Sequence, residues 1–168
     1  MTRCFLLGIF LLTTGCTRHS SSLNDMMWFV GDWEGIRLDT EDGTEEPIAV
    51  NVAVLADGSG LIERLEVKTA DKPYLGFTVF TPLDSANCWL MTYANSVRPT
   101  FSSLSGPAAN QRIVLETIEA RGNRKSRVVL EMVDSLHIRR TNFIALRDGN
   151  EWRKLFTDEL VLQGHGQK

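Results

Sequence analysis

The spacing of hydrophobic and polar residues along this chain changes at Trp33. Before that residue, apolar side chains from Leu23 to Val30 recur at the spacing of one helix face. Ser22-Leu23-Asn24-Asp25 has the Ser-x-x-acid form of a capping box, which satisfies free N–H groups at a helix start. After Trp33, apolar and polar residues alternate, most clearly from Ile48 to Val54. The pattern predicts a helix of about two turns, followed by β-strands.

Ten segments beyond Trp33 have the composition or the two-residue period of β-strands. Turn residues such as Asp42-Gly43, Asp57-Gly58 and Gly106-Pro107 separate them. No long helical pattern recurs, which favours hairpin connections over helical crossovers. The predicted strands are residues 34–40, 47–56, 60–69, 74–81, 87–94, 100–104, 111–120, 126–133, 136–146 and 151–162.

So many antiparallel strands must close into a barrel or stack as two sheets, because open sheet edges invite aggregation. The short and even spacing of the turns favours an all-β, antiparallel up-and-down β-barrel of about eight to ten strands. The N-terminal helix is expected to plug one end of it. A two-sheet sandwich is the alternative. The predicted barrel domain spans residues 23–163, and residues 164–168 form a C-terminal tail.

The first residues have the features of a secretion signal. Arg3 precedes an apolar run from Phe5 to Leu12, which is too short to span a bilayer as a helix. Gly15-Cys16 resembles the bacterial lipoprotein box, although Thr13 stands where the box usually has leucine. The resemblance implies a signal peptide over residues 1–15, lipidation of Cys16 and a flexible tether over residues 16–22. An ordinary secreted protein is the alternative.

Charge and cysteine count agree with an envelope protein. The formal net charge is −3, which excludes the broad basic surface that nucleic-acid binding needs. If Cys4 leaves with the signal and Cys16 carries lipid, Cys88 is the remaining cysteine, so no intramolecular disulfide forms. Thr17, rather than aspartate, after the lipidated cysteine favours the periplasmic side of the outer membrane in a Gram-negative cell.

The helix and the first strand together carry a family resemblance. Phe29-Val30-Gly31-Asp32-Trp33-Glu34-Gly35 contains a Gly-x-Trp motif that resembles the calycin superfamily, which includes lipocalins, and bacterial lipocalin-like families of unknown function. In calycins the tryptophan closes the barrel floor and stacks under an arginine from a late strand. The resemblance implies this structural role for Trp33, with Arg153 or Arg140 as its cation–π partner.

A ligand site in such a barrel requires polar residues that face an apolar interior. One face of residues 136–146 includes Ile138, Arg140, Asn142 and Ile144. If this face points inward, Arg140 and Asn142 are orienting donors within an apolar cup, and the arginine suits an anionic head group. A one-residue shift or a bulge would instead turn both towards solvent.

Trp89 and Tyr93 share a strand face and are further candidate ligand contacts, with a role in the barrel core as the alternative. In nitrobindin-like barrels a strand histidine binds haem iron. The strand histidine here, His137, matches no such motif, so haem is not expected and no cofactor or metal is predicted.

Three functions follow from these residues. The first is an envelope lipoprotein, tethered to the membrane by its N-terminal lipid, whose barrel binds or carries a small apolar or amphipathic ligand. The second is a non-enzymatic interaction or scaffold lipoprotein with a filled barrel. The third is a barrel enzyme, such as an isomerase or cyclase, that acts on a lipid-like substrate. No catalytic motif supports the third.

Overall fold

The structure is a computed structural model, and it describes residues 22–69, 72–83, 88–97, 101–118, 124–146 and 151–164. The predicted signal peptide, the lipidation site Cys16 and nearly all of the predicted tether lie outside these residues. The described elements are a 3₁₀ helix, η1 (Leu23–Phe29), and the strands β1 (Gly31–Asp39), β2 (Glu45–Val54), β3 (Leu61–Val67), β4 (Tyr74–Leu83), β5 (Cys88–Asn95), β6 (Ser102–Gly106), β7 (Ala108–Ala109), β8 (Arg112–Thr117), β9 (Arg124–Asp134), β10 (His137–Leu146) and β11 (Arg153–Leu162).

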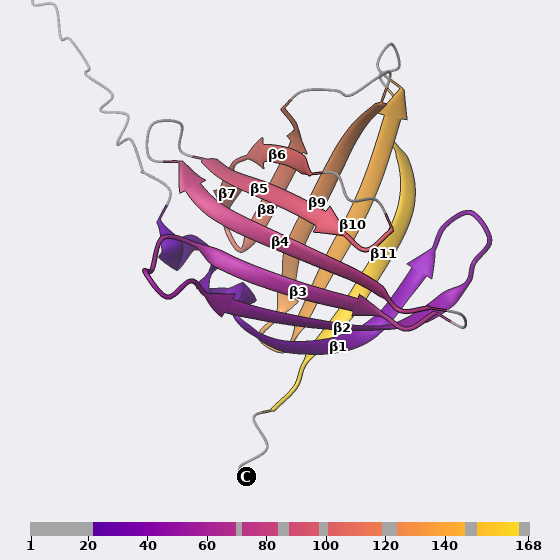
Figure 1. Cartoon of the computed structure of the whole chain (residues 1–168), viewed down its shortest axis with the longest axis horizontal. Coiled ribbons are helices and arrows are strands. Elements are labelled where there is room, and N and C mark those ends of the chain that lie inside the picture. Colours follow the sequence, from indigo (N-terminus) through magenta and orange to yellow (C-terminus); the bar gives the residue numbers. More distant parts are fainter. Residues whose placement is uncertain are drawn as a thin grey trace, which may run out of the picture.

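The strands form one closed antiparallel barrel (Figure 1). Each long strand pairs with its neighbours in the sequence, β1 pairs with β11, and β6 pairs with β8. These last two pairings close the ring, so the wall holds all the described strands except the two-residue β7, which lies against β8. The predicted up-and-down barrel is therefore confirmed, and the sandwich alternative is wrong.

The short helix packs its apolar side chains against one end of the barrel. Met26 and Phe29 are fully buried, and the Phe29 ring meets the Phe80 ring of β4 edge to face, with 5.8 Å between centroids. The Trp33 Nε1–H donates a hydrogen bond of 2.9 Å to the Phe29 carbonyl oxygen, which fixes the helix to the start of β1. At the helix start, the Ser22 backbone N–H donates to the Asp25 carboxylate (2.7 Å).

Side chains that point into the barrel differ between its two ends. Next to the helix they are large and apolar, and they form a close-packed core. One step further from the helix, buried charged residues replace them: Glu63 follows Leu61 on β3, and Arg140 follows Ile138 on β10. The apolar end includes Trp33, Leu61, Phe80, Trp89, Ile138 and Leu160. The half of the barrel far from the helix therefore combines buried charged residues with buried apolar ones such as Leu65 and Val67.

Candidate ligand-binding cavity

Four charged side chains from four strands meet inside the barrel. Arg140 on β10 donates from Nη1 to both oxygens of Glu63 on β3, at 2.9 and 2.8 Å, and from Nε to Asp158 on β11, at 3.0 Å. Arg37 on β1 donates to both Asp158 oxygens, at 2.7 and 3.0 Å. We call these four residues the buried charge cluster. It is held by charge-assisted hydrogen bonds, which are stronger than neutral ones.

The buried charge cluster is almost completely shielded from water. The side chains of Glu63 and Asp158 are 0% exposed, and those of Arg140 and Arg37 are 9% and 11% exposed. Burial alone lowers the pKa of Arg140, but the carboxylates of Glu63 and Asp158 outweigh this effect and raise that pKa above its ordinary value. The formal charges of the two arginines and the two acids sum to zero, as buried charges require.

The cluster joins walls that are far apart in the sequence. Arg140 and Glu63 are 77 residues apart and belong to strands that are not neighbours in the sheet. Thr78 on β4 adds a hydrogen bond of 2.9 Å to Glu63. The ion pair therefore crosses the interior and connects the β3–β4 side of the barrel to the β10–β11 side.

A cavity of about 230 Å³ lies beside the cluster, inside the far half of the barrel. At about 30 Å³ per water molecule, its volume of about 230 Å³ equals roughly eight waters. The lining is mixed, with apolar, hydroxyl and guanidinium groups, but Glu63 and Asp158 do not line it. Its lining residues are Arg37, Leu65, Tyr74, Thr78, Met91, Tyr93, Ser102, Leu104, Ser126, Val128, Arg140, Asn142 and Phe156.

Two residues of the cavity lining each have a buried nitrogen atom without a hydrogen-bond partner among the described residues. These atoms are Nη2 of Arg140 and Nδ2 of Asn142. A buried donor without a partner costs about 1–3 kcal/mol, so such donors in native proteins usually bind water or a ligand. Both donors therefore belong to residues of the cavity wall and lack a partner among the described residues, so a ligand atom that reached them would satisfy them.

Tyr93 lines the cavity, and the neighbouring strand β4 has a glycine, Gly76, beside its ring. The Tyr93 hydroxyl hydrogen-bonds the hydroxyl of Tyr74. A Cβ atom at Gly76 on β4 would lie only 3.1 Å from Cε2 of Tyr93. A larger residue at position 76 would therefore require the Tyr93 ring to move by a few tenths of an ångström.

The structure brings together three of the four predicted ligand contacts. Arg140, Asn142 and Tyr93 all line the cavity, so the alternative in which Arg140 and Asn142 face solvent is wrong. Their role in ligand binding stays a prediction. Trp89 is 0% exposed and belongs to the apolar core, outside the cavity lining, so the structure favours its alternative role as a core residue over that of a ligand contact.

Arg153 was a predicted partner of Trp33, and the strand register shows that this pairing is wrong. Trp33 pairs with Leu162 at the end of β11, whereas Arg153 begins that strand. Nine residues of strand separate them by about 30 Å. The other candidate, Arg140, belongs to the buried charge cluster. In the described part of the chain no cation lies over the Trp33 ring, while Arg37 lies 4.0 Å from the Phe156 ring centroid.

Sequence reasoning missed Glu63, Asp158 and Arg37 as site residues. A signal for Glu63 was present, because it interrupts the alternating apolar face of β3 between Leu61 and Leu65. A charged residue at an inward-facing position of a barrel strand requires a partner of opposite charge. The partner's identity depends on which walls face each other, and local spacing does not carry that information.

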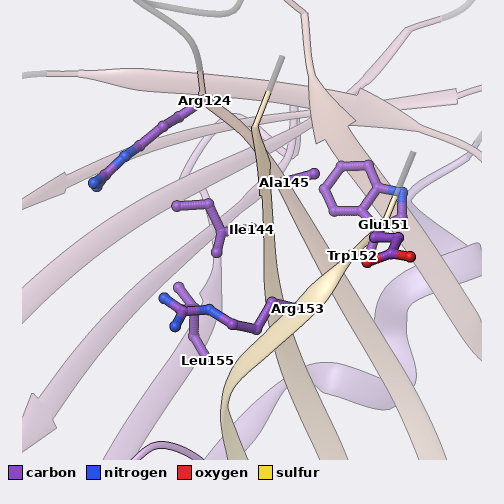
Figure 2. Close-up of a pocket in the computed structure, with 7 residues that line it drawn as sticks. All are labelled: Arg124, Ile144, Ala145, Glu151, Trp152, Arg153 and Leu155. Carbon is purple, nitrogen blue, oxygen red and sulfur yellow. The ribbon is translucent and has the colours of Figure 1, made fainter. Parts of the chain in front are cut away.

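A second hollow, with a volume of about 680 Å³, lies where β9 and β11 begin and β10 ends (Figure 2). We call it the end groove. Figure 2 shows the side chains of Arg124, Ile144 and Arg153 on one side of β10, with Ala145 and Trp152 on the other. The end groove is lined by Arg124, Ile144, Ala145, Glu151, Trp152, Arg153 and Leu155.

Residues considered for other chemistry lie outside these hollows. His137 is exposed at the start of β10, with its Nδ1 atom 2.7 Å from the Asp134 carboxylate. Cys88 is a half-buried free thiol. The described residues contain no cluster of three or more His, Cys, Asp or Glu side chains arranged to hold a metal ion. Nor do they include a helix with the length and apolar character to cross a membrane.

Comparison with known proteins adds no family to this description. No family model matches the chain, and no curated protein sequence matches it. The resemblance to calycins thus stays a prediction that rests on the Gly-x-Trp motif and the helix-then-barrel order of elements.

Proposed function

We propose that this protein is a binding protein for a small amphipathic molecule, one end of which occupies the inner cavity. The observation that carries the proposal is the pair of buried, unpartnered donors, Arg140 Nη2 and Asn142 Nδ2, on two residues that line an interior hollow. A mostly apolar pocket with a few placed polar groups is typical of ligand sites. A hydrogen-bond acceptor on the ligand would satisfy both donors.

The charge balance of the buried charge cluster favours an uncharged acceptor. From sequence alone, an arginine in the cup suits an anionic head group, but Arg140 already binds two carboxylates. A ligand carboxylate beside Arg140 would give the buried cluster a net negative charge. The carboxylate would also lose its hydration without gaining a positive partner that is not already paired. An amide, ester or alcohol oxygen adds no charge and accepts the same hydrogen bonds.

The volume of the cavity limits the size of the part of the ligand that can enter it. A volume of about 230 Å³ is below the roughly 300–1,000 Å³ of pockets that enclose drug-sized molecules. Leu65, Met91, Val128 and Phe156 supply apolar surface for a short chain or a small ring. A cavity of this size also argues against the alternative of a scaffold with a filled barrel.

The proposed binding function is compatible with the predicted location in the cell envelope. Lipidation at Cys16 would tether the barrel to a membrane, on the periplasmic side of the outer membrane in a Gram-negative cell. The tether would hold the binding barrel near lipid and near the amphipathic molecules that partition into it. Mass spectrometry of small molecules released from the purified protein is the direct way to identify the ligand.

Asn142→Leu is expected to weaken binding of hexanamide, a small neutral probe, by about three- to tenfold, because one hydrogen bond contributes about 0.5–1.5 kcal/mol. The measurement is isothermal titration calorimetry at low salt. Hexanoate, which has the same chain length, is expected to bind the wild-type protein more weakly than hexanamide.

The matched control is Asn51→Leu, which makes the same change on the outer face of β2, where Asn51 is exposed and bonds Asp32. It is expected to leave hexanamide binding unchanged. Equal affinities of Asn142→Leu and wild type for hexanamide would refute the proposed role of the cavity. Tighter binding of hexanoate than of hexanamide, if Asn142→Leu removes the difference, would refute the uncharged acceptor.

A further inference from the structure

The end groove continues the inner face of the barrel beyond the cavity. On β9, Arg124 lies two residues from Ser126, and on β10, Ile144 lies two residues from Asn142. Residues two apart on a strand share a face, so Arg124 and Ile144 lie on the face of the cavity residues, one level further from the helix. The part of the end groove that Arg124 and Ile144 line is therefore the next level of the face that lines the cavity, while Ala145 and Trp152 line the groove from the other side of β10.

A β-bulge places Arg153 on this face too. Asn142 pairs with Phe156, but Ile144 pairs with Arg153, so β11 contributes one extra residue between these two pairs. In an unbroken ladder Lys154 would stand opposite Ile144. Bulges re-aim side chains in this way. Arg153 thereby joins Arg124 on the same side of β10, as Figure 2 shows.

The charge of the end groove differs from that of the cavity. Its lining has two arginines, Arg124 and Arg153, and one acid, Glu151, whose side chain lies on the Trp152 side in Figure 2. Neither arginine forms an ion pair with another described residue, in contrast to Arg37 and Arg140. The described lining of the end groove therefore has an excess of positive charge, two arginines against one acid, next to an electrically balanced charge cluster.

We propose that the end groove binds the anionic group of the same ligand whose uncharged end occupies the cavity. This inference rests on the proposed function and narrows the ligand to an amphipathic anion, such as a carboxylate or phosphate monoester, bound with its charge outward. Adjacent levels of the barrel face are about 7 Å apart, so a short linear chain connects the two sites. Guanidinium groups bind carboxylate and phosphate through paired N–H donors.

The test compares two probes of the same length by calorimetry. Suberamic acid has an amide at one end and a carboxylate at the other, and suberamide has an amide at both ends. Wild-type protein at low salt is expected to bind suberamic acid about fivefold more tightly, the effect of one or two exposed ion pairs. The preference should disappear in about 1 M salt, where charges are screened within roughly 3 Å.

The double variant Arg124→Gln/Arg153→Gln is expected to bind both probes equally. Arg112→Gln is the control, because it removes an exposed arginine that pairs with Glu131 away from the groove, and it should keep the fivefold preference. Equal binding of the probes by wild type, or an unchanged preference in the double variant, would overturn the inference.

Asn142→Leu separates this inference from the proposed function. This substitution is expected to weaken the binding of both probes by the same factor, because both place an amide in the cavity. If it does so while wild type shows no preference for suberamic acid, the end groove is not an anion site and the cavity proposal stands. If Asn142→Leu weakens the binding of neither probe, or if neither probe binds the wild-type protein, both proposals are overturned.

Discussion

Phe29→Ala is expected to lower the free energy of unfolding by about 3–5 kcal/mol, the range for removal of a large aromatic side chain from a core. Phe29 is fully buried and meets Phe80 edge to face, so truncation would leave a cavity between the helix and the barrel. Its carbonyl oxygen would still accept from Trp33, because the backbone is unchanged. Urea denaturation followed by tryptophan fluorescence measures the loss.

Met27→Ala is the matched control on the same helix. Met27 is 42% exposed, and substitutions at exposed sites usually change stability by less than about 0.5 kcal/mol. If the two variants lost similar stability, the helix would not act as the closing element of the apolar end. A large loss confined to Phe29→Ala would show that the barrel depends on this contact.

The wall of the barrel was predictable because each of its strands has a recognisable pattern in its own local sequence. Alternation and turn residues mark all the strands that form the ring, and the observed β3, Leu61–Val67, lies within the predicted residues 60–69. Among the strands that the structure describes, β7, Ala108–Ala109, is the one without a predicted counterpart, because two residues are too few to show any period. Closure followed from the number of strands, since an open sheet of this size leaves edges exposed.

The side chains that face the interior were predictable only where their orientation follows from the sequence of a single strand. Arg140 and Asn142 share a face of β10, so their common orientation follows from spacing alone. The partners of these side chains cannot be predicted from spacing. Glu63, which pairs with Arg140, is 77 residues away in the sequence, and the two strands face each other only in the closed barrel. A bulge is equally invisible to a count of alternate residues, which is why the orientation of Arg153 emerged only from the strand register.

Asp158→Asn is expected to cost about 3–5 kcal/mol of unfolding free energy, the range for breaking a buried ion pair by removal of one partner. Asp158 accepts hydrogen bonds from both Arg37 and Arg140, and its side chain is 0% exposed. Asparagine keeps the shape but not the charge, so two buried arginines would face the single carboxylate of Glu63. The measurement is again urea denaturation at neutral pH.

The next residue on β11 supplies the control. Glu159 points outward, pairs with Arg139 at 2.6 Å, and is 53% exposed. Glu159→Gln is expected to cost no more than about 1 kcal/mol, as exposed ion pairs do. Equal losses from Asp158→Asn and Glu159→Gln would mean that burial does not set the strength of these pairs in this barrel.

Removing a positive charge together with the negative one tests the charge balance itself. In Asp158→Asn/Arg37→Met, Arg140 and Glu63 remain as one pair and the formal charge of the cluster returns to zero. Replacing a buried ion pair by an uncharged one is often neutral or stabilising, so the double variant is expected to recover part of the loss. If it is less stable than Asp158→Asn, individual hydrogen bonds hold the cluster rather than its neutrality. The preference for an uncharged ligand end would then lose its physical basis, because that preference depends on the same balance.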